Sequence, residues 1–274
     1  MNQNTFTTGP LTGSLLLHGG VGLDNDKLFK KTFVELAGGP SKLLIYIPTA
    51  FSEEQLESQH KIHLDSDWAA KRFGFNSAMV LNTRDRKEAD SELFVEPITK
   101  ASAVFFTGGR QWRLADSYLN TKTHEELIKL LDRGGVIAGS SAGATIQGSF
   151  LVRGNSRPDD NTIMIGDHTE GLGLINNCAI DQHLLQFNRQ FDLVEVIKRN
   201  PELLGIGIDS QTTICVQRNE FTVFGKSCVA VYDKKIWSNE NVSASPKKPK
   251  QYFKLLRHGQ RFNLKKRKIV SRRK

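Results

Sequence analysis

Cysteine is scarce in this sequence, and so are the other features that define several large protein classes. The three cysteines, Cys178, Cys215 and Cys228, have the spacing of neither a zinc site nor a redox pair. No apolar run approaches the roughly 18 residues that span a bilayer, and no basic segment precedes the first apolar run, as it would in a secretory signal. We therefore predict a cytoplasmic protein with reduced thiols, no metal or cofactor and no membrane partner.

Acidic residues are missing from one end of the chain. Residues 246–274 contain 13 lysines and arginines but no aspartate or glutamate, whereas the remainder holds 25 basic and 29 acidic residues. The net charge of +9 therefore belongs to the C-terminal end, and a basic end can attract polyanions. We interpret residues from about 265 to 274 as a loose basic tail that aids solubility, and we do not expect a nucleic acid as the specific partner.

What the sequence does contain is a regular alternation of apolar runs with amphipathic stretches. Apolar runs typical of buried strands occupy residues 13–20, 42–50, 77–83, 101–109 and 135–139. Stretches typical of helices lie between them, at residues 25–39, 53–75 and 124–135. Strands that alternate with helices favour an α/β fold with a mainly parallel central sheet and helices on both faces.

The pattern changes beyond residue 200. Five short apolar runs follow one another closely, at residues 203–209, 212–217, 220–225, 227–234 and 252–259. Close spacing of this kind favours antiparallel strands, which we expect to extend the same sheet in the C-terminal third. Because the chain has no internal repeat and no obvious linker, we predict a single α/β domain over residues 1–274.

The residues GSSAG at 139–143 place Ser141 between a predicted strand and a predicted helix. The pattern G-x-S-x-G is found where a serine nucleophile stands on a sharp turn at the carboxyl edge of a sheet. Small neighbours leave room for the backbone, and the helix N-terminus places positive dipole near a developing oxyanion. A tight turn without any chemical role also needs small residues, so the motif alone leaves both interpretations open.

A nucleophilic serine requires a base, and the sequence offers seven histidines. His183 ends an apolar run in the motif Asp-Gln-His, which puts it at a strand end, where open α/β sheets carry their sites. An esterase of the α/β-hydrolase class would instead take its base from late in the chain, which makes His258 the alternative.

Four motifs resemble, in their order, those of one family of serine peptidases. FFTGGRQWRL, GVIAGSSAGA, AIDQHLLQ and LLGIGIDSQTTI are similar to motifs of the cyanophycinase and dipeptidase E family, and most of all to its cyanophycinase branch. The resemblance covers most of the chain. It implies a fold like that of the class I glutamine amidotransferases, hydrolysis of aspartyl or β-aspartyl bonds, and a peptide or isopeptide substrate.

Carried over residue by residue, the resemblance implies a serine–histidine–acid triad. The nucleophile falls on Ser141 and the base on His183, and the acid falls in the stretch between them, where Asp159 is our choice. The family motif is weak at the acid, so three alternatives remain: Asp160, Asp181 and Asp209.

The same resemblance indicates which residues surround the triad. The oxyanion hole is expected from the backbone N–H groups of Gly108, Gly109 and Ala142. The substrate-binding residues are expected to be Gln111, Asp181, Gln182 and Arg189.

The sequence departs from the family in the segment that follows Asp-Gln-His. Cyanophycinases carry several arginines there, whereas this chain keeps Arg189 and has Phe187 and Asp192 where others are expected. Neither side chain can replace the guanidinium fork that binds a carboxylate. We therefore expect short aspartyl peptides, rather than cyanophycin, as substrates. A catalytically silent binding protein with a polyanion-binding tail is the alternative outside the enzymes, and a homodimer is the assembly we consider.

Overall fold

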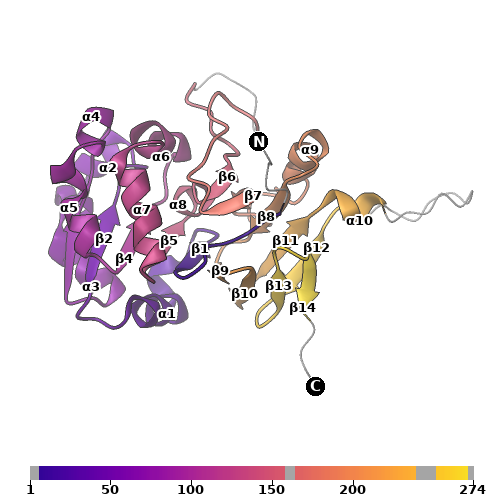
Figure 1. Ribbon diagram of the computed structural model, residues 1–274, viewed down its shortest axis with the longest axis horizontal. Coiled ribbons are helices and arrows are strands. Elements are labelled where there is room, and N and C mark those ends of the chain that lie inside the picture. The colour runs from indigo at the N-terminus through magenta and orange to yellow at the C-terminus, as the bar shows by residue number, and fades with distance from the viewer. Residues whose placement is uncertain (1–5, 158–163, 239–250, 271–274) are drawn as a thin grey trace, which may run out of the picture.

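Five parallel strands form one side of a nine-stranded sheet, from its middle to its edge. The computed structural model describes residues 6–157, 164–238 and 251–270. Across the sheet the five strands lie in the order β1, β5, β4, β2, β3. Their bounds are β1 Ser14–His18, β2 Leu43–Ile47, β3 Ser77–Val80, β4 Ala103–Phe106 and β5 Val136–Ser140. Strands β1, β4 and β5 are buried along their whole length, as parallel strands covered on both faces are. The predicted α/β fold with a mainly parallel sheet is therefore confirmed (Figure 1).

Helices cover both faces of this sheet. Their bounds are η1 Leu23–Asn25, α1 Lys27–Ala37, α2 Glu53–Glu57, η2 Gln59–Leu64, α3 Ser66–Phe73, α4 Arg86–Ala89, α5 Glu92–Lys100, α6 Gln111–Tyr118, α7 Lys122–Asp132 and α8 Ala142–Thr145. Helices α1 and α3 pack on one face through Phe29, Phe33 and Phe73. Helices α5, α6 and α7 pack on the other face with the largest apolar cluster.

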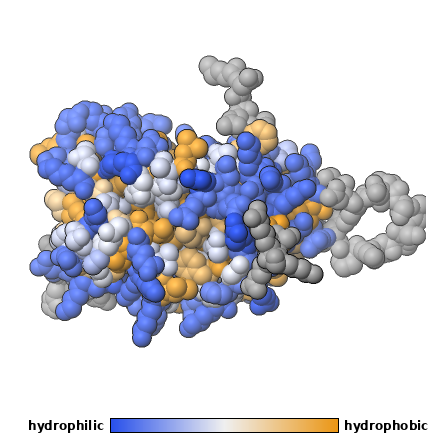
Figure 2. Space-filling view, turned by 60° about the horizontal axis from the view of Figure 1, so that its bottom comes forward, coloured by the Kyte–Doolittle hydropathy of each residue, from blue (hydrophilic) through white to orange (hydrophobic). Residues whose placement is uncertain are grey.

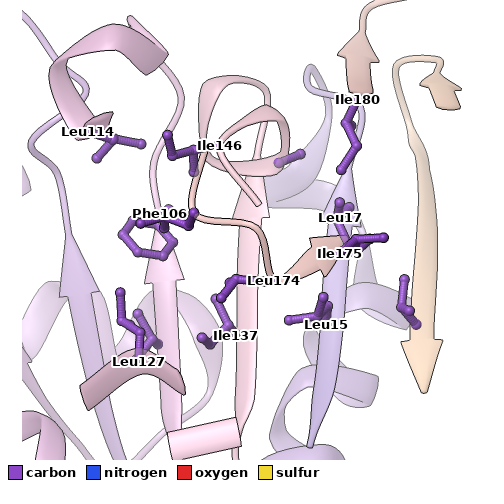
Figure 3. Close-up of a cluster of buried hydrophobic side chains, with 14 of the residues drawn as sticks. Leu15, Leu17, Phe106, Leu114, Leu127, Ile137, Ile146, Leu174, Ile175 and Ile180 are labelled. Carbon is purple, nitrogen blue, oxygen red and sulfur yellow. The ribbon is translucent and has the colours of Figure 1, made fainter. Parts of the chain in front are cut away.

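Successive side chains of a strand point to opposite faces of the sheet, so each strand contributes to the cores on both faces. Leu15 and Leu17 of β1 belong to the same cluster as Phe106 and Ile137, which Figure 3 shows gathered on one side of the sheet. Leu16 belongs to the phenylalanine-rich cluster beneath α1. All three leucines of β1 are therefore committed to packing, and a polar residue stands at each of its two ends.

The C-terminal strands are divided between two sheets, whereas the sequence led us to expect additions to one. Strands β9 Thr212–Gln217, β10 Glu220–Gly225, β13 Arg261–Asn263 and β14 Lys268–Val270 extend the large sheet antiparallel from the free edge of β1. A second sheet has the order β12-β11-β8-β7-β6. Its strands are β6 Gly148–Phe150, β7 Ile175–Gln182, β8 Leu204–Ile208, β11 Cys228–Tyr232 and β12 Lys254–Arg257. With α9 Asp192–Arg199 and α10 Lys234–Ser238, these strands lie at the end of the molecule away from α2–α5 (Figure 1).

The two sheets share one apolar core. The largest cluster joins Leu15 and Ile137 of the nine-stranded sheet with Ile180, Ile206 and Val229 of the five-stranded sheet. Burial of apolar surface is the main favourable term in folding, so this shared cluster holds the sheets together. The boundary of a single domain over 1–274 stays a prediction.

The long helix expected over 53–75 is wrong, because capping residues interrupt it. Ser52 and Gln55 form a capping box at the start of α2, and Ser58 ends that helix in an extended conformation. The Asp65 carboxylate then accepts the backbone N–H of Trp68 and starts α3. Side chains of this kind satisfy helix-end N–H groups and so set where helices begin.

The expectation of a loose tail from residue 265 is wrong for residues 265–270. Strand β14 pairs with β13, and Leu264 before it is fully buried. The guanidinium of Arg267 is nearly buried and forms an ion pair with Asp233 at 3.3 Å. Arg267 is part of the fold because it has a carboxylate partner. Residues 271–274 lie outside the described part of the chain.

The surface combines charged regions with scattered apolar side chains. On the face shown in Figure 2, apolar residues gather near the middle of the molecule, between hydrophilic surfaces on either side. Three large apolar side chains from one segment are exposed: Leu185, Phe187 and Phe191. Within the described residues, every helix is too short or too polar to cross a bilayer.

The close packing of α8 on the sheet makes a testable prediction for Gly143. A Cβ at this position would lie 2.2 Å from the carbonyl oxygen of Phe106, so Gly143→Ala must displace backbone. We expect a loss of about 1–3 kcal/mol in the free energy of unfolding, measured by urea denaturation. Gly108→Ala is the control, because its nearest contact would be Ser141 Cβ at 3.4 Å. Equal stability of the two variants would contradict the packing argument.

Candidate active site

Ser141 occupies a strained turn between β5 and α8. Its φ of 55° and ψ of −114° are uncommon for a residue with a side chain. A Cβ on Gly139 would come within 2.1 Å of the Gly143 carbonyl oxygen, so the turn accepts only glycine there. The Ser141 N–H donates to the His18 carbonyl at 3.0 Å and ties the turn to β1. The side chain is thereby held at the carboxyl edge of the parallel sheet.

His183 reaches Ser141 from the other sheet. It follows β7, and its Nε2 lies 3.0 Å from the Ser141 Oγ. The His183 backbone N–H donates to the Gly19 carbonyl at 3.0 Å. A Cβ on Gly20 would come within 2.0 Å of the imidazole Cε1, so this glycine loop after β1 lies directly against the ring. The motifs GSSAG and Asp-Gln-His, 42 residues apart at the serine and the histidine, are thus brought together.

The opposite nitrogen of His183 contacts a hydroxyl group. Nδ1 lies 3.0 Å from the Oγ of Ser210, which follows β8. The Ser210 hydroxyl in turn donates to the Gln186 Oε1. Within the described residues, the hydrogen-bond partner of the His183 Nδ1 is therefore the Ser210 hydroxyl and not a carboxylate.

The environment keeps His183 neutral. Burial of the ring and the positive charge of Arg189 lower the pKa of His183 below its usual 6.5. Gln186, Asp181 and Asp209 act in the opposite direction and are outweighed. A neutral imidazole with a free Nε2 lone pair can accept the proton of a serine hydroxyl.

The segment that follows β4 borders the Ser141 hydroxyl. The Cβ that would replace a hydrogen of Gly108 lies 3.9 Å from the Ser141 Oγ. Gly109 has a φ of 136° and passes so near to Ala50 that a Cβ would lie 2.1 Å from its carbonyl. In the described part of the chain, the N–H groups of Gly108, Gly109 and Ala142 have no acceptor. Such donors are available to a substrate oxyanion.

Two of the expected substrate-binding residues have structural partners of their own. Gln111 begins α6, is almost fully buried and donates from Nε2 to the Val152 carbonyl at 2.8 Å. Asp181 is fully buried and accepts a two-pronged bond from Arg153, at 2.8 Å from Nε and 3.0 Å from Nη2. Arg153 also binds the Asp192 carboxylate at 2.5 Å. Asp181 therefore anchors Arg153 instead of contacting His183.

Arg189 is the arginine whose positive charge acts on His183, and its side chain is partly exposed. Its Nη1 donates to the carbonyl and side-chain oxygens of Gln182, at 3.2 and 3.1 Å, and lies 4.0 Å from Asp181. Its guanidinium carbon stands 4.9 Å from the centre of the Phe187 ring, which is itself 5.0 Å from the His183 ring. Phe187 is 52% exposed and forms an apolar wall beside the base.

A buried histidine supports the glycine loop that faces His183. His18 ends β1 and is fully buried, and its Nδ1 accepts the Gly20 N–H at 3.1 Å. The same nitrogen lies 3.3 Å from the Ser140 Oγ. Burial lowers the pKa of His18 to about 4, so the ring stays neutral and remains an acceptor for Gly20.

Of the four candidates for the triad acid, Asp181 and Asp209 make their hydrogen bonds to groups other than the His183 ring. Asp159 and Asp160 lie outside the described residues. The Asp209 carboxylate accepts the N–H groups of Leu185 and Gln186, at 2.8 and 3.2 Å, and so shapes the turn after His183.

His258 forms its hydrogen bond with a residue outside the candidate site. It lies between β12 and β13, where its Nδ1 accepts the Gly225 N–H at 3.3 Å. Within the described ranges, no group of three or more His, Cys, Asp or Glu side chains is arranged to hold a metal ion.

Sequence reasoning missed Ser210, Gln186 and Arg153. Ser210 stands at the end of a predicted strand, in the same position that drew attention to His183, and this was the available signal. Gln186 and Arg153 lie in irregular segments, and their roles depend on contacts across 24 to 39 residues of sequence.

The comparisons with known proteins agree with this geometry. The sequence model described as peptidase family S51 matches residues 15–224. A cyanophycinase from Geminocystis herdmanii is 31% identical over 266 residues, which cover 93% of this chain and 95% of that protein. A cyanophycinase from a Nostoc species is 31% identical over 206 residues, 74% of this chain and 67% of that protein.

A solved structure shares the fold. The crystal structure of a peptidase from an acI-B1 actinobacterium superposes with a TM-score of 0.64 and 24% identity, and covers 93% of this chain and 98% of that one.

Burial of neutral His18 predicts a specific dependence of stability on pH. The folded protein binds a proton at His18 only near pH 4, whereas the unfolded chain binds one near 6.5. Stability from this group is therefore complete above pH 6.5 and is lost as the pH falls to 4, by about 3 kcal/mol.

In His18→Asn, an acceptor remains near the Nδ1 position but the titrating group is gone. Urea denaturation between pH 7 and 4 should show a flatter decline in stability than in the wild type. The exposed His258, changed to Asn, is the control and should decline as the wild type does. Parallel curves for wild type and His18→Asn would contradict the assignment.

Proposed function

Since the chain belongs to peptidase family S51 and is a serine-type peptidase, we propose that Ser141 is its nucleophile and His183 its general base. The observation that carries this proposal is the 3.0 Å contact between the Ser141 Oγ and the His183 Nε2. The strained turn at Ser141 supports it, because strain of this kind is concentrated at functional sites.

The chemistry follows from this contact. Ser141 attacks the carbonyl carbon of the scissile bond while His183 takes the hydroxyl proton at Nε2. His183 then returns the proton to the leaving amine, and the acyl-enzyme is hydrolysed by a water molecule that the same base activates. The N–H groups of Gly108, Gly109 and Ala142 stabilise the negative charge on the carbonyl oxygen in both steps.

We propose short peptides with an aspartyl or β-aspartyl bond as substrates. The curated relatives are cyanophycinases by name, and Arg189 offers a guanidinium to an aspartyl carboxylate within the neighbourhood of His183. The second guanidinium, of Arg153, is bound by Asp181 and Asp192. One accessible arginine suits one acidic group, and this favours a short peptide over a polymer that bears many.

The roles of Ser141 and His183 can be tested together. Ser141→Ala and His183→Ala should each lower kcat by at least about 10³-fold, because either change removes the nucleophile–base pair. His258→Ala should keep wild-type activity. An organophosphonate should label Ser141, as read by peptide mass spectrometry. Labelling at Ser140, or full activity in Ser141→Ala, would refute the assignment.

Arg189 should determine the preference for acidic substrates. Loss of a charge-assisted contact costs roughly 1.5–3 kcal/mol, so Arg189→Ala should reduce kcat/KM for aspartyl dipeptides by about 10 to 150-fold. The matched neutral dipeptides should lose much less, and this ratio corrects for effects on His183. Arg199→Ala, at an exposed arginine paired with Glu195, is the control.

The rate of cyanophycin hydrolysis tests the proposed preference for short peptides over the polymer. It should be low beside that of aspartyl dipeptides, since Phe187 cannot bind a carboxylate and Arg153 is already bound by Asp181 and Asp192. Equal or faster turnover of cyanophycin would show that other residues bind the polymer and that the proposed substrate is wrong.

A further inference from the structure

We propose that Ser210 and Gln186 form an uncharged hydrogen-bond relay that positions His183, in the place where serine peptidases usually have a carboxylate. The relay runs from Ser141 through His183 and Ser210 to Gln186. This inference rests on the proposed function, because it concerns how the proposed base is oriented. Ser210 and Gln186 are positioning residues and do not touch the substrate.

The direction of the hydrogen bonds determines the tautomer of His183. A serine hydroxyl has one hydrogen, and the Ser210 hydroxyl donates it to the Gln186 Oε1. The Ser210 oxygen can then only accept at its other contact, the 3.0 Å approach of the His183 Nδ1. The proton of the neutral imidazole is thereby kept on Nδ1. The lone pair is left on Nε2, where the Ser141 hydroxyl lies.

Asp209 builds the relay but is not a member of it. One of its oxygens accepts the backbone N–H groups of Leu185 and Gln186, at 2.8 and 3.2 Å. The other accepts the Ser227 hydroxyl at 2.5 Å. The Asp209 carboxylate therefore fixes the turn that carries Gln186. Because Ser210 follows Asp209 in the sequence, this turn brings Gln186 close to Ser210. Both oxygens of Asp209 are committed, and so are those of Asp181, which bind Arg153.

An uncharged relay has an electrostatic consequence. The imidazolium that forms when Ser141 loses its proton has no anion in hydrogen-bond contact within the described residues. The charged groups that act on it are Asp181 from β7, Asp209 from the end of β8 and Arg189 from its own turn, with His18 of β1 as a further titratable neighbour. Burial and Arg189 prevail and lower the pKa of His183. The base therefore keeps its Nε2 lone pair to a lower pH than an ordinary histidine does.

The experiment measures the rate at which an organophosphonate labels Ser141 as a function of pH. This rate reports the reactivity of the Ser141–His183 pair and requires no knowledge of the substrate. The wild type should lose reactivity with an apparent pKa below 6.5, the usual value for histidine. Ser210→Ala should lower the plateau rate by about 3 to 10-fold, the range for a hydrogen bond between uncharged groups.

Variants that add charge separate a positioning role from a merely structural one. Ser210→Asp puts a carboxylate at Nδ1 and should raise the apparent pKa by about 1–3 units. Gln186→Glu keeps an acceptor one hydrogen bond further away and should raise it by less. Gln186→Leu removes the acceptor and should slow labelling, and the double variant with Ser210→Ala should be no slower than the slower single variant. Ser227→Ala, which disturbs the same turn outside the relay, should leave the apparent pKa unchanged.

Two results would overturn the relay. One is a Ser210→Asp and a Gln186→Glu variant that both fold and both keep the wild-type apparent pKa. The other is an Asp159→Asn variant that loses 10³-fold or more, alongside a Ser210→Ala variant with unchanged rate. Failure of the proposed function is distinguishable, since Ser141 would then remain unlabelled in the wild type. In that case ¹⁵N NMR of His183 still decides the relay: it requires the Nδ1–H tautomer in the wild type and a mixture in Ser210→Ala.

Discussion

The close approach of the Gly143 backbone to the end of β4 is the constraint on which the rest of the site depends. A single Cβ at Gly143 would lie 2.2 Å from the Phe106 carbonyl. This contact places the short helix α8 directly against the sheet, beside Ser141 with its uncommon backbone conformation. Gly108, two residues beyond Phe106, lies next to the Ser141 side chain. The packing of these two backbone segments therefore bears on Ser141 and Gly108 at the same time.

The site lies where the two sheets meet, and neither sheet contains it alone. Ser141 belongs to the end of β5 in the large sheet, whereas His183 and Ser210 follow β7 and β8 in the small one. The glycine loop after β1 connects them, because Gly19 accepts the His183 N–H and Gly20 lies against its ring. The shared apolar core beneath keeps these strand ends in register. The contact between Ser141 and His183 thus depends on the packing between the two sheets.

Most charged side chains around the site form ion pairs with one another. Asp181 and Asp192 bind Arg153, which leaves Arg189 as the cation that acts most strongly on His183. The same arginine serves two ends in our proposals. It attracts an acidic substrate, and it lowers the pKa of His183, the base that takes the proton of Ser141. A single charged side chain can couple specificity to reactivity in this way because both effects decline with distance and it lies near both groups.

The sequence by itself determined the parallel strands, the turn at Ser141 and the place of His183 at a strand end, because each depends on local periodicity and on small residues at a turn. It did not determine the break at Ser58 and Asp65, where caps override helical spacing. Only the tertiary structure decided that the C-terminal strands divide between two sheets and that Ser210, 27 residues beyond His183, takes its Nδ1. Strand partners and long-range hydrogen bonds depend on which edges and carbonyls are left open after the core has packed. Strand pairing and these hydrogen bonds therefore depend on the whole chain, and no single motif predicts them.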